Sequence, residues 1–235
     1  MDEGGELPID LNAFSKTTES AGTKVYLPDN DSGGKVFKVG KAEYSARSGK
    51  NALEEVKEFR HAENVALATA SRRTKEAIVP QQYVLVEGST RGYARTARVP
   101  NYIEGVPLGK LGFAGIMNLD HENIVTLRSI LKDSIKCYLT YGTNYDLSGS
   151  DEQDAVKKSR LLNLKRLVFP LRHSVNLRLT ENGVKLIDPN VLGKPSSKQS
   201  LKQQILQGLN FVSSVVDYVL LGVYDRINQL QISQG

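Results

Sequence analysis

The sequence of 235 residues predicts an α+β fold, on two observations. The first hundred residues alternate between β-prone and helical patterns in the order strand, strand, helix, strand, strand. The remainder is mostly helical in pattern, apart from one hairpin around an Asn-Gly turn, which is the strongest local signal in the chain. At about 100–200 residues per domain, this length allows one large domain or two lobes that share a cleft.

The predicted elements of the first region, residues 23–100, form a sheet with one helix. Short β-prone runs flank turn-rich segments, which is typical of paired strands, and apolar residues recur at helical spacing between the two strand pairs. The expected elements are strands at 24–27 and 35–39, a helix over 50–73, and strands at 83–86 and 93–99.

The second region begins after a connector at 101–108, where Gly105 and Pro107 interrupt both periods. Asp120 is a possible N-cap for the first long helix of this region. The expected elements are a helix from 120 to 135, a polar segment over 143–160 that is either an exposed loop or the approach to another helix, and a hairpin with strands at 175–180 and 184–188. Either one long helix or a helical pair follows over 200–231 and carries an apolar stripe.

The composition is that of a globular protein, with 40% hydrophobic and 24% charged residues, and excludes wholesale disorder and collagen-like structure. The single cysteine, Cys137, cannot form an internal disulfide, which favours a reducing compartment. The N-terminus lacks the pattern of a secretory signal, and the most apolar stretch, 211–223, is shorter than the about 20 residues of a membrane span. We therefore expect a cytoplasmic protein without membrane contact, or one that acts inside a host cell if it is an effector.

The net charge of +5 is unevenly distributed. Residues 1–34 contain seven acidic and two basic side chains, so they carry −5 and the other 201 residues carry +10. Residues 1–22 are polar and lack periodicity, which predicts a flexible acidic arm. The basic body favours anionic partners such as nucleotides, nucleic acid or acidic protein surfaces, although solvated surface Lys and Arg residues would explain the charge equally well.

The hairpin carries the most specific motif: the run from Asn176 to Asp188 reads NLRLTENGVKLID. It resembles the protein-kinase hairpin that leads from the catalytic-loop asparagine to the metal-binding aspartate. Lys38, which follows a Gly-containing turn, is similar to the kinase strand lysine, and the connector resembles the kinase hinge. Over residues 20–195 the resemblance implies a bilobal protein-kinase-like fold, with an N-lobe at 23–100, a hinge at 101–108 and a reduced, mostly helical C-lobe at 109–235.

The resemblance implies ATP and Mg²⁺ as cofactors. Lys38 would then supply a cation to the phosphates, as phosphoryl transfer requires. Asn176 and Asp188, at opposite ends of a hairpin, would offer an amide and a carboxylate oxygen to Mg²⁺. Glu104 of the hinge would contribute to nucleotide binding.

A kinase-like lysine also needs a carboxylate from the neighbouring helix. Glu63 falls on the apolar stripe of that helix and is the preferred partner of Lys38, with Glu58 second. Solvation explains a glutamate on a helix equally well.

The chain departs from the kinase pattern at the catalytic base. The kinase base lies five positions before the asparagine, and this position is Leu171, which cannot accept a proton. His173 is close in sequence, but Asp146 is the better substitute if its loop enters the cleft. No G-x-G-x-x-G motif is present in the first hairpin, no A-P-E segment follows Asp188, and only 47 residues remain after it.

Three functions stay open. The first is a divergent kinase-like protein, similar to small examples from bacteria, phages and mobile elements, that transfers a phosphoryl group to a hydroxyl. The second is an inactive pseudokinase that binds or regulates another protein through its C-terminal apolar helix and acidic arm. The third is a nucleic-acid-binding protein that uses basic residues such as 157–160, although no aromatic residues are interleaved with them.

Overall fold

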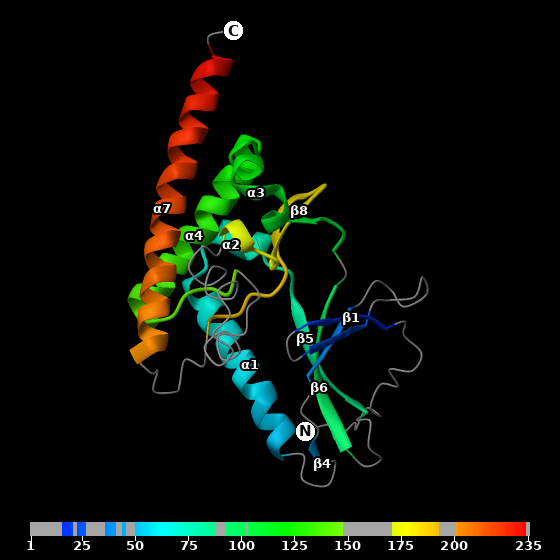
Figure 1. The fold of residues 1–235 in the computed structure, drawn as a ribbon. Helices are drawn as coiled ribbons and strands as arrows, with labels where there is room; N and C mark the ends of the chain where they lie inside the picture. Colours follow the sequence, from blue (N-terminus) through cyan, green and yellow to red (C-terminus); the bar gives the residue numbers. More distant parts are fainter. Residues whose placement is uncertain are drawn as a thin grey trace. The chain divides into compact units, whose positions relative to one another are not determined.

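The α+β class is confirmed, with helices and two antiparallel sheets (Figure 1). The chain divides into unit 1, residues 1–60 and 80–102, and unit 2, residues 61–79 and 103–235. The computed structural model describes residues 16–20, 23–26, 36–40, 44–45, 50–87, 93–101, 103–147, 171–192 and 201–233.

Unit 1 contains a six-stranded sheet in which every pair is antiparallel. Its strands are β1 (Lys16–Ser20), β2 (Thr23–Tyr26), β3 (Phe37–Gly40), β4 (Tyr44–Ser45), β5 (Gln81–Glu87) and β6 (Tyr93–Pro100). Both predicted strand pairs are confirmed, because β2 pairs with β3 and β5 pairs with β6. The apolar core of the sheet consists of Phe37, Val39, Val86, Ala97 and Val99.

The prediction of a flexible arm over residues 1–22 is wrong for its last part. Residues 16–20 form β1, which pairs with β2 through partners such as Thr18 and Val25. Two consecutive threonines favour an extended strand, and pairing with β2 provides hydrogen-bond partners for the backbone. Residues 1–15 lie outside the described residues.

Helix α1 (Lys50–Thr69) begins in unit 1 and packs there against the β5–β6 hairpin. The ring of Phe59 stacks on Tyr83 with a centroid distance of 6.2 Å, and the guanidinium of Arg98 lies 5.1 Å from the Phe59 centroid. The hydroxyl of Thr96 on β6 donates a hydrogen bond to Glu55. One helix therefore makes both apolar and polar contacts with the β5–β6 hairpin.

The predicted helix over 50–73 is divided in two. It ends at Thr69, and Ser71 starts a second helix, α2 (Arg72–Ala77), as an N-cap that accepts a hydrogen bond from the backbone of Thr74. A serine at this position favours a helix start, since its side chain satisfies a backbone donor of the first turn. Ser71 also donates to Asp133 at 2.7 Å, which ties α2 to the centre of unit 2.

Unit 2 contains a three-stranded antiparallel sheet and several helices. Its further elements are β7 (Val106–Pro107), α3 (Leu108–Met117), α4 (His121–Tyr141), the 3₁₀ turn η2 (Leu171–His173), β8 (Leu177–Thr180), β9 (Gly183–Leu186) and α7 (Leu201–Ile232). The predicted Asp120 cap is confirmed, because its carboxylate accepts a hydrogen bond from the backbone of Asn123 at 2.8 Å. Sequence patterns missed α3, whose apolar run is interrupted by Gly112 at φ 66°.

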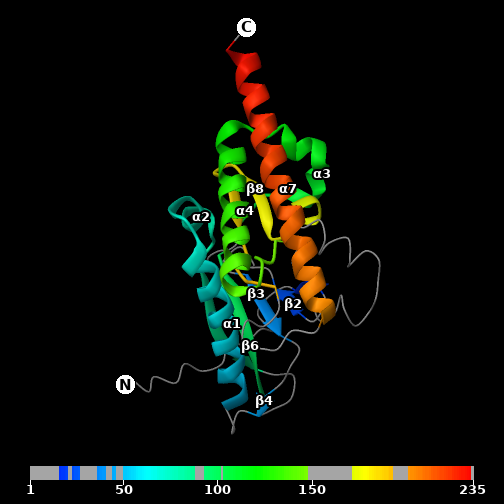
Figure 2. The ribbon, with the colours of Figure 1, turned by 90° about the vertical axis from the view of Figure 1, so that its left-hand side faces the viewer.

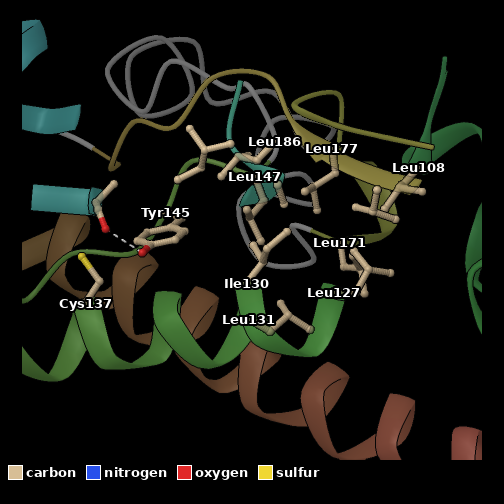
Figure 3. Close-up of a cluster of buried hydrophobic side chains, with 14 of the residues drawn as sticks. Leu108, Leu127, Ile130, Leu131, Cys137, Tyr145, Leu147, Leu171, Leu177 and Leu186 are labelled. Atoms are coloured by element: carbon tan, nitrogen blue, oxygen red, sulfur yellow. Dashed lines mark hydrogen bonds between the residues drawn. The ribbon is translucent and has the colours of Figure 1, made fainter. Parts of the chain in front are cut away.

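The core of unit 2 lies between α4 and the β8–β9 hairpin (Figure 3). Side chains of both elements and of the connecting segments meet in one cluster that excludes water. Its fully buried members include Leu108, Leu127, Ile130, Leu131, Tyr145, Leu147, Leu171, Leu177 and Leu186. This cluster fixes the position of the hairpin relative to α4.

The C-terminal segment is one continuous helix, α7, and not a helical pair. It runs antiparallel to α4, as Figures 1 and 2 show. The ring of Tyr138 near the end of α4 stacks on Phe211 at 4.7 Å, and His121 at the start of α4 lies 2.8 Å from Asp225. Among the described helices, one, over Gln203–Ile232, is long and apolar enough to cross a membrane by length and composition, which is weak evidence for a membrane span. The apolar stretch identified from the sequence, 211–223, is only the middle of this helix, which continues at both ends.

The two faces of α7 are inverted relative to an ordinary surface helix. The buried face is largely polar and includes Gln207, Asn210, Ser213, Ser214, Asp217 and Asp225. The exposed face carries the predicted apolar stripe, with Val216 and Val219 each about half exposed. The helix therefore faces the rest of unit 2 with polar side chains together with a few apolar ones, such as Leu206 and Leu221.

Asp217 makes stability depend on pH. Burial raises the pKa of Asp217 to about 6, an effect that Arg172 partly offsets. Between the ordinary pKa of about 3.9 and this value, the folded protein binds more protons than the unfolded chain, so this residue destabilises the fold increasingly as pH rises from 4 to above 6. We expect Asp217→Asn to raise the free energy of unfolding by about 2–3 kcal/mol at pH 7.5 and by little at pH 4, as measured by urea denaturation.

The exposed Glu181→Gln variant is the matched control and should change stability by no more than about 0.5 kcal/mol at either pH. An equal effect of Asp217→Asn at both pH values would contradict this explanation.

Candidate functional site

The open end of the β8–β9 hairpin brings together two of the predicted site residues. Leu177 pairs with Leu186 in the strand register, and the next backbone hydrogen bond joins Ile187 N to Asn176 O at 2.8 Å. Asp188 follows directly. Asn176 and Asp188, twelve positions apart in sequence, therefore lie at the same end of one hairpin, and both are buried.

A third segment of unit 2 places Asp146 at the same end. The side-chain amide of Asn176 donates to the carbonyl oxygen of Asp146 at 2.8 Å, and the backbone N–H of Asp146 donates to the carbonyl oxygen of Asn190 at 2.8 Å. Asp146 is thus held between the start of β8 and the residues that follow β9. Three chain segments converge here, although Asp146 and Asn176 are 30 residues apart.

Ser174 reinforces this junction. Its buried hydroxyl donates to the carbonyl oxygen of Leu147 at 2.7 Å and accepts a hydrogen bond from the backbone of Leu177 at 3.0 Å. One side chain therefore links the residue after Asp146 to the first residue of β8.

The prediction of an exposed loop over 143–160 is wrong for residues 143–147. Thr143, Asn144, Tyr145 and Leu147 are buried, and residues 148–170, which include the basic run 157–160, lie outside the described residues. Buried irregular backbone needs hydrogen-bond partners, and side chains provide them here. The backbone N–H of Asn144 donates to Gln207 of α7 at 3.1 Å, and that of Tyr145 donates to the hydroxyl of Ser134 of α4 at 3.0 Å.

Tyr145, which directly precedes Asp146, is anchored in the core of unit 2 (Figure 3). Its hydroxyl donates to the carbonyl oxygen of Ala66 at 2.7 Å and lies 3.0 Å from the hydroxyl of Thr69. Burial raises the pKa of the Tyr145 phenol above its ordinary value, so the side chain stays neutral at physiological pH. The last turns of α1 therefore help to position Asp146.

The oxygen atoms of the site suit a hard cation. The carboxylate of Asp188 accepts a hydrogen bond from the amide nitrogen of Asn190. The amide oxygen of Asn190 is buried and has no hydrogen-bond partner among the described residues. An orphaned carbonyl oxygen beside a carboxylate is a suitable pair of ligands for Mg²⁺, which prefers oxygen and keeps several waters.

The cation would be held by few charged ligands. No group of three or more His, Cys, Asp or Glu side chains in the described ranges is arranged to bind a metal ion. Sequence reasoning did not identify Asn190 as a possible ligand. Its place two residues after the motif aspartate was the available signal, since Asn and Asp side chains commonly hydrogen-bond within such short segments.

Leu171, at the position expected for the catalytic base, is fully buried and belongs to the apolar core. Counting five residues back from Asn176 therefore leads to a packing residue in η2 and not to the polar junction. In space, the backbone of Asp146 is hydrogen-bonded to the side chain of Asn176.

The remaining predicted residues are distributed over both units. Lys38 is partly buried and lies second in β3 of unit 1, where it pairs with Arg98 of β6 in the strand register. Of the two helix glutamates, Glu58 belongs to the part of α1 in unit 1 and Glu63 to the part in unit 2. Glu104 is exposed in the irregular segment that precedes β7 of unit 2. Unit 2 thus contains the three predicted residues that meet at the end of the hairpin, Asp146, Asn176 and Asp188, and unit 1 contains Lys38.

The chain matches no protein-family model, and no curated protein is similar to it in sequence. The junction of Asp146, Asn176, Asp188 and Asn190 is therefore the main guide to function.

The integrity of this junction can be tested through Ser174. Ser174→Ala removes two buried hydrogen bonds without creating a large cavity: the backbone N–H of Leu177 loses its bond to the hydroxyl, and the carbonyl oxygen of Leu147 keeps only the longer bond from Asn176 N at 3.3 Å. We expect a loss of about 1–3 kcal/mol in the free energy of unfolding, measured by urea denaturation.

Thr140→Ala is the control, because the exposed Thr140 hydroxyl also bonds a backbone oxygen but is accessible to water. It should cost no more than about 0.5 kcal/mol. Equal effects of the two variants would show that the Ser174 bonds are not important for the fold.

Proposed function

We propose that the chain is a divergent protein-kinase-like protein that binds ATP with Mg²⁺ and transfers a phosphoryl group to a hydroxyl. The observation that supports this proposal is the hydrogen bond from the Asn176 amide to the backbone of Asp146 at the end of the hairpin that leads to Asp188. It assembles, in one unit, the residue types that phosphoryl transfer uses: a base and two oxygen ligands for a metal.

The junction also accounts for the missing base. The kinase motif H-R-D-L-x-x-x-N has an Asp-Leu pair shortly before its asparagine. This chain has an Asp-Leu pair at 146–147, and residues 148–170 separate the pair from the segment that ends in Asn176. Under this interpretation an insertion within the catalytic loop displaces the aspartate in sequence, while the hydrogen bond keeps it beside the asparagine.

Each side chain then has a role in the reaction. Asp146 orients the acceptor hydroxyl and receives its proton. Asp188 and Asn176 offer oxygen ligands, with Asn190 as a third. Lys38 of unit 1 places a positive charge on the nucleotide phosphates, and Glu63 or Glu58 would hold that lysine. Glu104 would contact the nucleotide from the connector. When bound, Mg²⁺ supplies charge neutralisation to the transferred phosphate.

A second candidate function is a catalytically inactive, protein-binding pseudokinase. The exposed apolar face of α7 favours it, because monomeric soluble proteins seldom expose a long continuous aliphatic strip. Nucleic-acid binding has only the basic composition in its favour. A cytoplasmic or host-cell location stays a prediction from the single cysteine and the N-terminal sequence.

Nucleotide binding and catalysis can be separated by two sets of variants. With ATP and Mg²⁺ about 100-fold above Kd, we expect the Tm of the protein to rise by roughly 5–10 °C. Asp188→Asn and Lys38→Ala should lose this rise, because they remove a metal ligand and the phosphate cation. Asp146→Asn should keep it but reduce phosphoryl transfer, measured with labelled ATP as autophosphorylation or transfer to a generic protein acceptor, by about 10²–10⁴-fold.

Glu181→Gln, in the turn at the opposite end of the same hairpin, serves as the control and should behave as the unaltered protein. No Tm change with millimolar ATP and Mg²⁺ would overturn the nucleotide site. A Tm rise without any transfer would select the pseudokinase function.

A further inference from the structure

The exposed face of α7 has a regular pattern. Eight aliphatic side chains, which we name the α7 seam, are each between 44% and 55% exposed. They follow one another in steps of three or four residues along most of the helix. The seam consists of Ile205, Leu209, Val212, Val216, Val219, Val223, Ile227 and Leu230.

This spacing is that of a helix that packs lengthwise against another helix. Steps of three and four residues keep side chains on one face, and a sustained apolar repeat of this kind is the pattern of a coiled-coil seam. Among the described side chains of α7, Arg226 is the only exposed charged one. The seam is therefore an almost uncharged strip that the described part of the chain leaves about half exposed.

The helix cannot bury the seam by rotating about its own axis, because its opposite face is engaged. The side chain of Gln207 donates to the carbonyl oxygen of Leu192 at 3.0 Å and accepts hydrogen bonds from Asn144. Asp225 is buried and lies 2.8 Å from His121 of α4. Rotation would break these bonds and leave their buried partners, the Leu192 carbonyl oxygen and the Asn144 N–H groups, without them.

We propose that a second copy of this chain packs antiparallel on the α7 seam to form a homodimer, whether or not the protein binds nucleotide. The seam is complementary to itself under a two-fold axis between residues 217 and 218. Val216 then faces Val219 of the second copy, and Val212 faces Val223. The outer pairs are Ile205 with Leu230, and Leu209 with Ile227 to within one position. A two-fold interface requires this self-complementarity.

The seam is large enough for such a contact. At half exposure, eight Val, Leu and Ile residues present on the order of 600 Å² per copy. Two copies would bury about 1,200 Å², which reaches the lower limit for specific interfaces, where complexes are commonly weak. Since area alone does not set affinity, a Kd on the order of micromolar is taken for the design of the test.

A recess beside the seam also suits a second helix. A hollow of about 540 Å³ is lined by Val219, Val223 and Ile227, with Arg128 of α4 at its side. Arg128 approaches α7 closely, since its guanidinium lies 4.6 Å from the ring centre of Tyr218 and a Cβ atom at Gly222 would lie 2.8 Å from it. In the antiparallel register, Leu209 and Val212 of the second copy lie opposite this hollow.

A second copy fits the seam better than a lipid bilayer does. By length and composition α7 could cross a membrane. However, α4 lies along it and exposes Lys132 and Lys136, whose charges would enter the bilayer with it. A partner helix covers the aliphatic strip and leaves both lysines in water.

Charge variants of the full chain test the proposal by sedimentation velocity at about 100 µM, well above a Kd on the order of micromolar. We expect about 52 kDa for the unaltered protein, twice the chain mass of 25.9 kDa. V216E/V219E and V216K/V219K should each be monomeric, with Kd raised at least about 100-fold, and should form a dimer when mixed. These positions are exposed, so both variants should keep the circular dichroism and Tm of the unaltered monomer.

Leu139→Glu is the control, since Leu139 is an exposed aliphatic residue of α4 outside the seam. It should leave the dimer unchanged. A monomeric unaltered protein, a dimer that the seam variants do not affect, or a monomer that instead binds phosphatidylserine vesicles through the seam would each overturn the proposal.

Cysteine pairs test the antiparallel register. Under mild oxidation, a mixture of V212C and V223C chains should form an intermolecular disulfide, and V212C alone should not. Native Cys137 is buried and does not interfere. Rapid disulfide formation by V212C alone would overturn the antiparallel arrangement.

Discussion

Unit 2 depends on one constraint: the backbone of the buried irregular segment 143–147 has to find hydrogen-bond partners away from water. The backbone of residues 190–192 provides some of them, and side chains of other elements provide the rest. Ser134 of α4 and Gln207 of α7 accept hydrogen bonds from backbone N–H groups of this segment. The hydroxyl of Thr143 donates a hydrogen bond to the carbonyl oxygen of Leu192 at 2.6 Å. An unsatisfied buried group costs about 1–3 kcal/mol, so several of them would consume much of the stability of a domain.

This constraint explains two features that otherwise have no connection. It holds Asp146 next to Asn176, because Asp146 belongs to the segment that the surrounding side chains fix in place. It also explains the inverted faces of α7, since the helix turns its amide, hydroxyl and carboxyl groups inward, where Gln207 meets Asn144. The aliphatic residues are left on the outside. The candidate catalytic junction and the exposed seam are thus two results of the same packing.

Local signals in the sequence predicted the elements that depend on neighbouring residues. The Asn-Gly turn fixed the β8–β9 hairpin, and the Asp120 cap marked the start of α4. The burial of Tyr145 could not be predicted, because its partners Ala66 and Thr69 are more than 70 residues away. Asn190, by contrast, was missed although its partner Asp188 lies only two residues before it. An apolar stripe such as that of α7 has the same pattern whether it faces a core or water, so its exposure depends on the tertiary structure.

The inverted helix also bears on how this protein evolves. Random substitution at a water-exposed helix position introduces polar residues often and at almost no energetic cost. Eight aliphatic residues would be lost quickly under such drift unless selection retained them. If related chains keep these residues while other exposed positions vary, the outer surface of α7 is under selection for a role other than the folding of a single chain.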